Sequence, residues 1–163
     1  MADEPDLRGD ALLEYLRETF RHTPLHDLLG FSFLESEPGQ VVVEMPVREQ
    51  AFNLSGNLHG GAIATLVDVA AGSCAARASG FDPVNQSLVT ADLHVRYLGR
   101  PKGDTIRAEA KIMRAGRMLI VVEVRVLDST DNVIAFADFS SMVVARREPL
   151  SAAGQSDPRS PDL

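Results

Sequence analysis

The chain has 163 residues, of which 45% are hydrophobic and 24% are charged, so it can bury a hydrophobic core and is predicted to form one globular domain. Sixteen Lys and Arg against 23 Asp and Glu give a net charge of −7, which argues against general binding to nucleic acid or to an anionic membrane. The single cysteine, Cys74, excludes an intramolecular disulfide and a thiolate metal cluster within one chain. No apolar run approaches the ~20 residues that cross a bilayer, and no signal peptide is evident, so we expect a cytoplasmic protein without membrane contact.

The two ends of the chain are predicted to lie outside the main domain. Residues 1–23 begin with an acidic segment, and the leucines and phenylalanine of residues 11–21 follow helical spacing, which predicts an amphipathic helix that ends before Pro24. Residues 148–163 are rich in Ser, Ala, Gly, Pro and Asp without periodicity, and we expect them to be a disordered tail. The domain itself is expected over residues 24–147.

A strand, a loop and a helix are predicted in the first half of this domain. After a connector, the sequence QVVVEMPV predicts a strand that starts at Gln40 and finishes near Pro46, because proline occupies strand ends or sheet edges. A loop rich in turn-forming residues follows over residues 53–61. Residues 61–79 carry one acid and one base only, so they predict a buried central helix. The apolar stripe of this helix consists of Ile63, Leu66, Val67, Ala70 and Cys74.

Four stretches with period-2 alternation follow, over residues 89–97, 105–112, 118–126 and 133–144. The first stretch is predicted to turn one set of side chains to the core: Val89, Ala91, Leu93, Val95 and Tyr97. Its opposite face would carry Thr90, Asp92, His94 and Arg96. The third stretch aligns Met118 with the core residues Ile120, Val122, Val124 and Val126. Short connections favour an antiparallel sheet, whose apolar face needs the helix as its partner. The expected fold class is α+β, with a curved antiparallel sheet wrapped around one long helix.

Asp68 is the first candidate functional residue. It lies about 140° from Ile63 on a helical wheel, off the apolar stripe and among small residues. An ordinary surface aspartate is the alternative, but an acid on a buried helix favours a functional carboxylate. Gly60 and Gly61 at the helix start would leave backbone N–H groups free for an oxyanion, unless they only form a turn that His59 caps. A donor cluster and a carboxylate two turns apart are the parts needed for acyl transfer.

Other kinds of site are less well supported. The chain has no G-x-S-x-G elbow and no phosphate-binding glycine loop, and Pro24 between His22 and His26 spoils a helical metal pair, so we expect no metal and no cofactor. Residues 96–117 carry a net charge of +5. This segment is either the solvated face of a strand pair or a basic rim for a phosphorylated ligand.

The segments N-L-S-G-N-L-H-G-G-A-I-A-T-L-V-D (53–68) and T-A-D-L-H-V-R-Y-L-G-R-P-K-G (90–103) resemble the hotdog-fold acyl-CoA thioesterases of the PaaI-like (phenylacetyl-CoA thioesterase-like) family. The specific element is the spacing Asn-x5-His-Gly-Gly-x6-Asp, and the resemblance covers about residues 24–146. It implies a hotdog fold and hydrolysis of an acyl-CoA or aryl-CoA to the free acid and CoA. The CoA is then part of the substrate.

The resemblance also implies roles for individual residues. Asp68 would act as general base or nucleophile, and the Gly60 N–H would polarise the thioester carbonyl. Asn53 would lie near that carbonyl, His59 beside the leaving thiolate, and Thr90 would help to position water. Gly61 is a candidate for substrate binding. The candidates for binding the CoA phosphates are Arg100, Lys102, Arg114 and Arg117.

The family places its active sites across a homodimer interface, with the Asp and Thr from one chain and the Asn-His-Gly loop from the other, and the dimers often pair into homotetramers. Phe52 and the loop 81–87 are expected to shape the acyl pocket. Two alternatives remain open from the sequence. One is a hotdog hydratase or dehydratase that acts on acyl thioesters, and the other is a non-catalytic acyl-CoA binding protein.

Overall fold

The computed structural model describes residues 23–34, 36–37, 39–78, 81–82 and 85–146. The helix predicted over residues 11–21 and the tail predicted over residues 148–163 lie outside the described residues. So does part of the loop 81–87.

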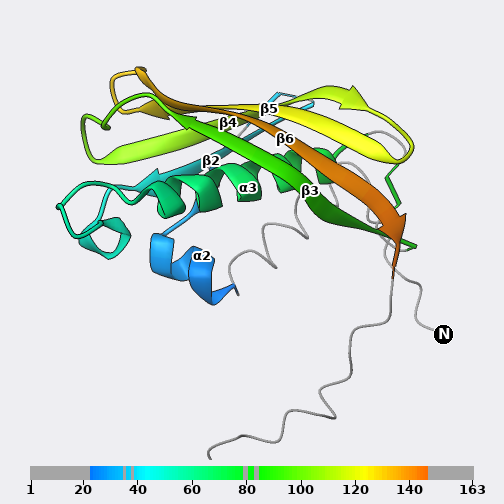
Figure 1. Cartoon of the computed structure of the whole chain (residues 1–163), viewed down its shortest axis with the longest axis horizontal. Helices are drawn as coiled ribbons and strands as arrows, with labels where there is room; N and C mark the ends of the chain where they lie inside the picture. The colour runs from blue at the N-terminus through cyan, green and yellow to red at the C-terminus, as the bar shows by residue number, and fades with distance from the viewer. Residues whose placement is uncertain (1–22, 35, 38, 79–80, 83–84, 147–163) are drawn as a thin grey trace, which may run out of the picture.

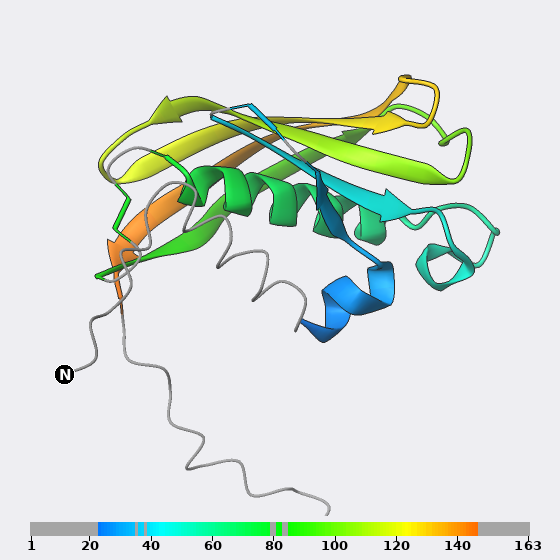
Figure 2. The ribbon, with the colours of Figure 1, turned by 180° about the vertical axis from the view of Figure 1, so that it is seen from behind.

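The domain is a six-stranded antiparallel sheet with one long helix against one of its faces (Figure 1). The strand order in space is β1-β2-β4-β5-β6-β3. The strands are β1 (Ser32–Leu34), β2 (Gln40–Pro46), β3 (Gln86–Tyr97), β4 (Thr105–Ala115), β5 (Leu119–Asp128) and β6 (Val133–Ala145). The helix α3 (Gly60–Ala76) runs beneath the sheet, as the view from behind also shows (Figure 2). This arrangement confirms the predicted hotdog fold.

The core lies between α3 and the sheet. The whole predicted stripe of the helix is buried, from Ile63 to Cys74. The strands meet it with β-branched residues and with the small residues Ala108, Ala110, Ala135 and Ala137, all of them fully or almost fully buried. Alanines on the sheet let the helix approach closely, because no long side chain separates the two backbones. The structure starts the helix at Gly60 and ends it at Ala76, three residues earlier than predicted.

Three short elements lie in segments where the sequence predicted only connection. They are α2 (Pro24–Leu29), β1, and the 3-10 helix η1 (Glu49–Ala51). Each has six residues or fewer, too few to show a helical or strand period. In the two ribbon views α2 lies on the side of α3 that faces away from the sheet (Figures 1 and 2).

A bulge in β3 overturns part of the predicted strand pattern. Its pairing with β6 shifts between Thr90 and Asp92. Before the shift, Thr90 pairs with the buried Ser141, while Val89 pairs with Met142 and is 51% exposed. The prediction that Val89 faces the core and Thr90 faces away is therefore wrong. One extra residue at the bulge restores the predicted phase, so Leu93 and Val95 do pack against the core.

A second correction concerns Met118, which was aligned with the core residues of the third stretch. It precedes β5, in the connection from β4, and is 62% exposed. Met118 lies in the short turn between β4 and β5, before the alternating residues of β5 begin. Its side chain is therefore exposed, although its spacing fits the pattern. The other residues predicted to face the core in that stretch are buried.

The strand β3 forms one edge of the sheet. It has 12 residues and pairs with β6 only, so no described strand covers its other side (Figure 1). A long open edge presents unpaired backbone N–H and C=O groups, which readily pair with another chain. Within the described part of the chain, no helix has the length and apolar character needed to span a membrane.

Candidate active site

Asp68 lies on α3 and receives a hydrogen bond from β3. The Thr90 hydroxyl donates to Asp68 Oδ1 over 3.0 Å, across 22 residues of sequence. The bulge makes this contact possible, because it turns Thr90 toward the helix side of the sheet. Asp68 is half-buried, and its second carboxylate oxygen receives no hydrogen bond from the described residues. The pair thus has an oriented carboxylate with an open acceptor site.

The start of α3 presents one unpaired backbone donor. His59 is the N-cap residue, and its carbonyl accepts the N–H groups of Ala62 and Ile63. The Gly61 N–H donates to His59 Nδ1 over 2.8 Å, so the prediction of two free glycine N–H groups is wrong for Gly61. The Gly60 N–H has no acceptor among the described residues. It lies at the positive end of the helix dipole, where a developing negative charge is stabilised.

The same hydrogen bond fixes the tautomer of His59. Because Nδ1 accepts the Gly61 N–H, a neutral imidazole must carry its proton on Nε2. The side chain is exposed, so its Nε2–H group is a donor available to a ligand. His59 therefore fulfils the capping role that the sequence left open, and it retains one donor for a second role.

The loop before the helix is folded around Asn53. Its Oδ1 accepts the backbone N–H groups of Ser55 and Asn57, at 2.9 Å and 3.1 Å. Its own N–H donates to the Asn57 carbonyl, and the Phe52–Leu58 bridge closes the loop. The amide oxygen of Asn53 is thus used to hold the loop. Its amide nitrogen, which has no partner among the described residues, remains as a donor.

These groups form two separate half-sites in one chain. Asn53, His59 and Gly60 lie together at the start of α3, whereas Asp68 and Thr90 lie together near its middle. Gly60 and Asp68 are eight residues apart on the helix, which corresponds to about 12 Å along its axis. In acyl transfer the oxyanion donor lies ~3 Å from the carbonyl oxygen and the attacking atom ~3 Å from the carbonyl carbon, so both groups must flank one carbonyl group. Within one chain the two half-sites therefore lie apart along α3.

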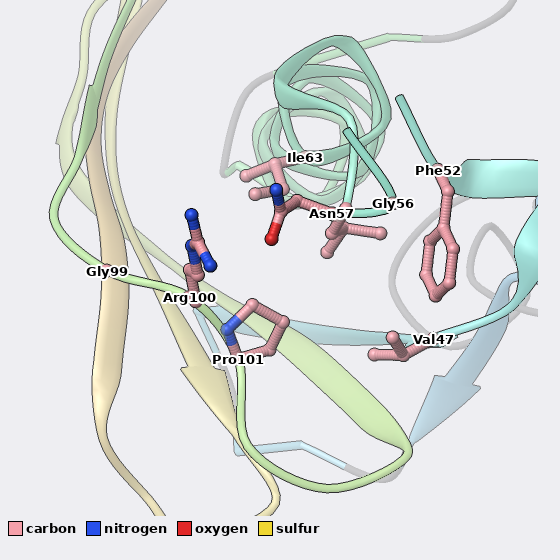
Figure 3. Close-up of a pocket in the computed structure, with 9 residues that line it drawn as sticks. Val47, Phe52, Gly56, Asn57, Ile63, Gly99, Arg100 and Pro101 are labelled. Atoms are coloured by element: carbon pink, nitrogen blue, oxygen red, sulfur yellow. The ribbon is translucent and has the colours of Figure 1, made fainter. Parts of the chain in front are cut away.

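A pocket of about 210 Å³ opens beside the first turn of α3. Figure 3 shows Val47 and Phe52 on one side of it, Arg100 and Pro101 on the other, and Ile63 against the helix. Its remaining lining residues are Gly56, Asn57, Leu58 and Gly99. Phe52, which the sequence proposed for an acyl pocket, does line it. The pocket adjoins the half-site that holds Gly60.

Comparison with known proteins supports one family. The Thioesterase superfamily profile matches residues 55–135. The chain is 35% identical over 125 residues, 75% of its own length and 80% of the relative's, to a Halobacterium salinarum protein provisionally named an esterase. The chain belongs to the thioesterase superfamily.

Two further relatives are more fully described. Acyl-coenzyme A thioesterase 13 of Pongo abelii is 29% identical over 119 residues, which are 70% of this chain and 80% of that protein. The crystal structure of zebra fish thioesterase superfamily member 2 aligns with a TM-score of 0.70 and 27% identity, covering 83% of this chain and 98% of that one.

In this member of the thioesterase superfamily, the basic segment 96–117, for which the sequence left a solvated face and a basic rim open, is not one continuous patch. Arg100 and Lys102 lie before β4, at the pocket end of the domain, while Arg114 and Arg117 lie at its far end. The 11 residues of β4 span roughly 35 Å between these pairs. Arg96 instead pairs with Asp138 on the outer face. Arg107 pairs with two carboxylates, those of Glu109 and Asp131.

Cys74 is excluded as a nucleophile of this site. The thiol is fully buried in the core, and burial raises its pKa to about 11. A thiol with so high a pKa is protonated at neutral pH and does not attack a thioester. The described residues also contain no group of three metal-ligating side chains.

Sequence reasoning missed one residue at this site, Tyr97. Its hydroxyl donates to the Gly60 carbonyl over 3.0 Å. The strand pattern predicted that Tyr97 faces the core side, but nothing in the sequence indicates that its ring reaches the start of a helix 37 residues earlier. Only the antiparallel placement of β3 against α3 brings the two together.

Proposed function

We propose that this superfamily member is an acyl-CoA thioesterase of the PaaI-like family, which hydrolyses a CoA thioester to the free acid and CoA. The observation that carries the proposal is the Thr90–Asp68 hydrogen bond, which orients a half-buried carboxylate and leaves one of its oxygens open. The unpaired Gly60 N–H supplies the complementary group, a donor for the carbonyl oxygen. The spacing of Asn53, His59, Gly60 and Asp68 supports the same family.

The active site is proposed to form between two chains of a homodimer. The open edge of β3 can pair with a second β3 about a twofold axis. Antiparallel pairing would run the two α3 helices in opposite directions, so the Gly60 end of one chain would approach Asp68 of its partner. This arrangement joins the half-sites that one chain keeps about 12 Å apart. Pairing of such dimers into a homotetramer is part of the proposal.

In the proposed reaction, the thioester carbonyl oxygen accepts the Gly60 N–H, and the Asn53 amide donates nearby. Asp68 takes a proton from water as the water oxygen attacks the carbonyl carbon, while the Thr90 hydroxyl holds the carboxylate. The C–S bond then breaks, and the proton passes to the CoA thiolate, which the His59 Nε2–H stabilises. Direct attack by Asp68 is the alternative route, and it would give an enzyme-bound anhydride that water hydrolyses. When a single turnover is run in ¹⁸O-water, the label can enter the Asp68 carboxylate only on that second route, by attack of water on the Asp68 carbonyl carbon of the anhydride.

The basic residues suggest how CoA binds. Arg100 and Lys102 lie at the end of the domain that holds Gly60, where the phosphates of the substrate would leave the pocket. The twofold axis would bring Arg114 and Arg117 of the second copy toward that same end. The backbone N–H of Gly61 is engaged by His59, and a Cβ atom on Gly61 would lie 2.9 Å from His59 Nδ1, so we assign Gly61 an indirect role, in which it leaves room for the His59 imidazole.

A mixing experiment tests both the reaction and the two-chain site. Gly60→Pro removes the proposed donor at the first helical position, where proline is otherwise well tolerated, and Asp68→Asn removes the proposed base. Each variant alone should be nearly inactive in release of free CoA thiol from a panel of aryl and short to long acyl-CoAs. Coexpressed dimers that assemble at random should regain about one quarter of wild-type activity, because half are mixed and each mixed dimer has one intact site of two.

Gly60→Ala is the matched control for Gly60→Pro, because it adds a side-chain carbon but keeps the N–H group. We expect Gly60→Pro to be at least about 10²-fold slower than Gly60→Ala. Failure of the mixed dimers to exceed the single variants would contradict the shared site. Absence of thiol release by the wild type across the whole panel would contradict the hydrolase itself, and would leave the hydratase and the binding protein.

A further inference from the structure

We infer that Tyr97 is a positioning residue of the active site, which holds the Gly60 peptide in place for the carbonyl oxygen of the substrate. The inference rests on the proposed function and adds a residue to it. Tyr97 is the last residue of β3 and is 53% exposed, so it does not belong to the hydrophobic core. The one side-chain hydrogen bond of Tyr97 in the described structure joins its hydroxyl to the Gly60 carbonyl.

The hydrogen bond compensates for a weak helix start. Gly60 and Gly61 are the first two residues of α3, and successive glycines have the greatest backbone freedom. The Gly60 N–H, the proposed donor, has no acceptor among the described residues, and its own peptide is held only at the His59 carbonyl, which accepts the N–H groups of Ala62 and Ile63. The next peptide, which joins Gly60 to Gly61, is held at its N–H group by the His59 cap. The Tyr97 hydroxyl, 3.0 Å from the Gly60 oxygen, holds the carbonyl group of that same Gly60–Gly61 peptide, and so restrains the residue that carries the proposed donor.

The ring of Tyr97 also lies close to the position that a side chain on residue 60 would take. Gly60 is not one of the glycines with positive φ, so backbone conformation does not require it. A Cβ atom placed on Gly60 would lie 3.3 Å from Tyr97 Cζ and 3.5 Å from its hydroxyl oxygen. The first contact is tighter than usual, so the ring would have to shift by a few tenths of an ångström and its hydrogen bond would be disturbed, whereas the second is an ordinary van der Waals contact. The missing side chain is the space that the tyrosine ring occupies.

Both half-sites are therefore tied to one strand. Thr90 ties Asp68 to β3, and Tyr97 ties Gly60 to β3. The proposed dimer pairs β3 with a second β3, so this strand would set the position of both reactive groups relative to the interface. Loss of the Tyr97 tether should move the oxyanion donor without removing it, which lowers the rate of the chemical step more than substrate binding.

The first test is Tyr97→Phe, which removes only the hydroxyl. We expect kcat to fall about tenfold, with KM for the best acyl-CoA within about twofold and Tm within about 2 °C. Tyr15→Phe is the matched control, since Tyr15 is the only other tyrosine, and it should keep full activity. An unchanged kcat in Tyr97→Phe, with Asp68→Asn inactive, would overturn this inference and leave the proposed function standing.

A double-variant cycle tests the ring contact. Gly60→Ala should lower kcat in the wild-type background, because its Cβ displaces the ring. In a Tyr97→Ala background the same change should have little further effect, since the space is then open. Independent, multiplicative effects would contradict the inference. If the wild type releases no thiol, the proposed function fails. The hydrogen bond from Tyr97 to Gly60 can still be tested by the amide NMR shifts of Gly60 and Gly61 in Tyr97→Phe. Unchanged shifts would overturn the inference that Tyr97 positions Gly60.

Discussion

Two aspartates of this domain, Asp68 and Asp128, are both withdrawn from solvent, but they differ in how their oxygens are used. Asp128 ends β5 and is 1% exposed. It accepts hydrogen bonds from three backbone N–H groups and two side chains: Lys102 N, Thr130 N, Asn132 N, Thr130 Oγ1 and Asn132 Nδ2. Asp68 is half-buried and accepts one hydrogen bond, from Thr90. The more deeply buried carboxylate is thus the fully satisfied one.

The difference separates a structural carboxylate from a reactive one. Burial opposes ionisation of Asp128, but the donors of Lys102, Thr130 and Asn132 outweigh it and hold its pKa well below the usual range. This charge organises the β5–β6 turn and ties it to the connection before β4, which carries Arg100. Asp68 keeps an open acceptor site, and that site is what a general base needs. The proposed role of Asp68 therefore rests on an unfilled carboxylate oxygen and not on deep burial.

The largest effect is expected for Asp68→Asn. The amide can still accept the Thr90 hydroxyl, so Tm should stay within about 2 °C, but kcat for thiol release should fall about 10³-fold because the base is lost. Steady-state kinetics and calorimetry measure the two quantities. Asp104→Asn, at an exposed acid outside the site, is the control and should leave both unchanged. Wild-type kcat in Asp68→Asn would remove the contrast between the two aspartates.

A smaller loss is expected when only the orientation of Asp68 is disturbed. Thr90→Val keeps the shape of the side chain but not its hydroxyl, and kcat should fall roughly 10-fold to 30-fold. Thr90→Ser keeps the hydroxyl and should retain most of the activity. The ratio of kcat for the Ser and Val variants is the measurement. Equal rates for the two would show that the hydrogen bond has no part in the reaction.

The smallest effect on activity, and the clearest one on stability, is expected for Asp128→Asn. Its amide nitrogen would face the Lys102 N–H or the Asn132 amide, so two donors would meet and Tm should fall by several degrees. The kcat of the folded protein should change by less than about twofold. Asp131→Asn, in the same turn but exposed and paired with Arg107, is the matched control and should change Tm little.

The loss of stability at acid pH tests the structural role assigned to Asp128. A carboxylate whose pKa is lower in the folded state stabilises the fold above its ordinary pKa of ~4, and this contribution is lost as the pH falls through the folded value. The free energy of unfolding of the wild type should therefore drop more steeply below about pH 4 than that of Asp128→Asn. Parallel curves would mean that the Asp128 charge contributes nothing to the fold.

Much of the fold was predictable because its periodic elements are long. The stripe from Ile63 to Cys74 and the alternation after residue 104 correctly predicted α3 and β4 to β6, with Met118 as the exception. The short α2, β1 and η1 could not be predicted, since fewer than seven residues show no period. The membership of the thioesterase superfamily, which the motif spacing predicted, is confirmed. The roles of Asn53, His59, Gly60, Asp68 and Thr90 stay predictions.

The sequence by itself determined the components of the site: a carboxylate on an apolar helix, two glycines at its start, and a hydroxyl residue on a later strand. Only the tertiary structure decided how these components meet. Thr90 reaches Asp68 because of a bulge, and a bulge depends on the register with β6, which local alternation cannot encode. The basic residues of the segment 96–117 form two separate groups because the extended strand β4 places its two ends roughly 35 Å apart. The helix rise of about 1.5 Å per residue keeps Gly60 and Asp68 apart within one chain, so a second chain is needed to complete the proposed site.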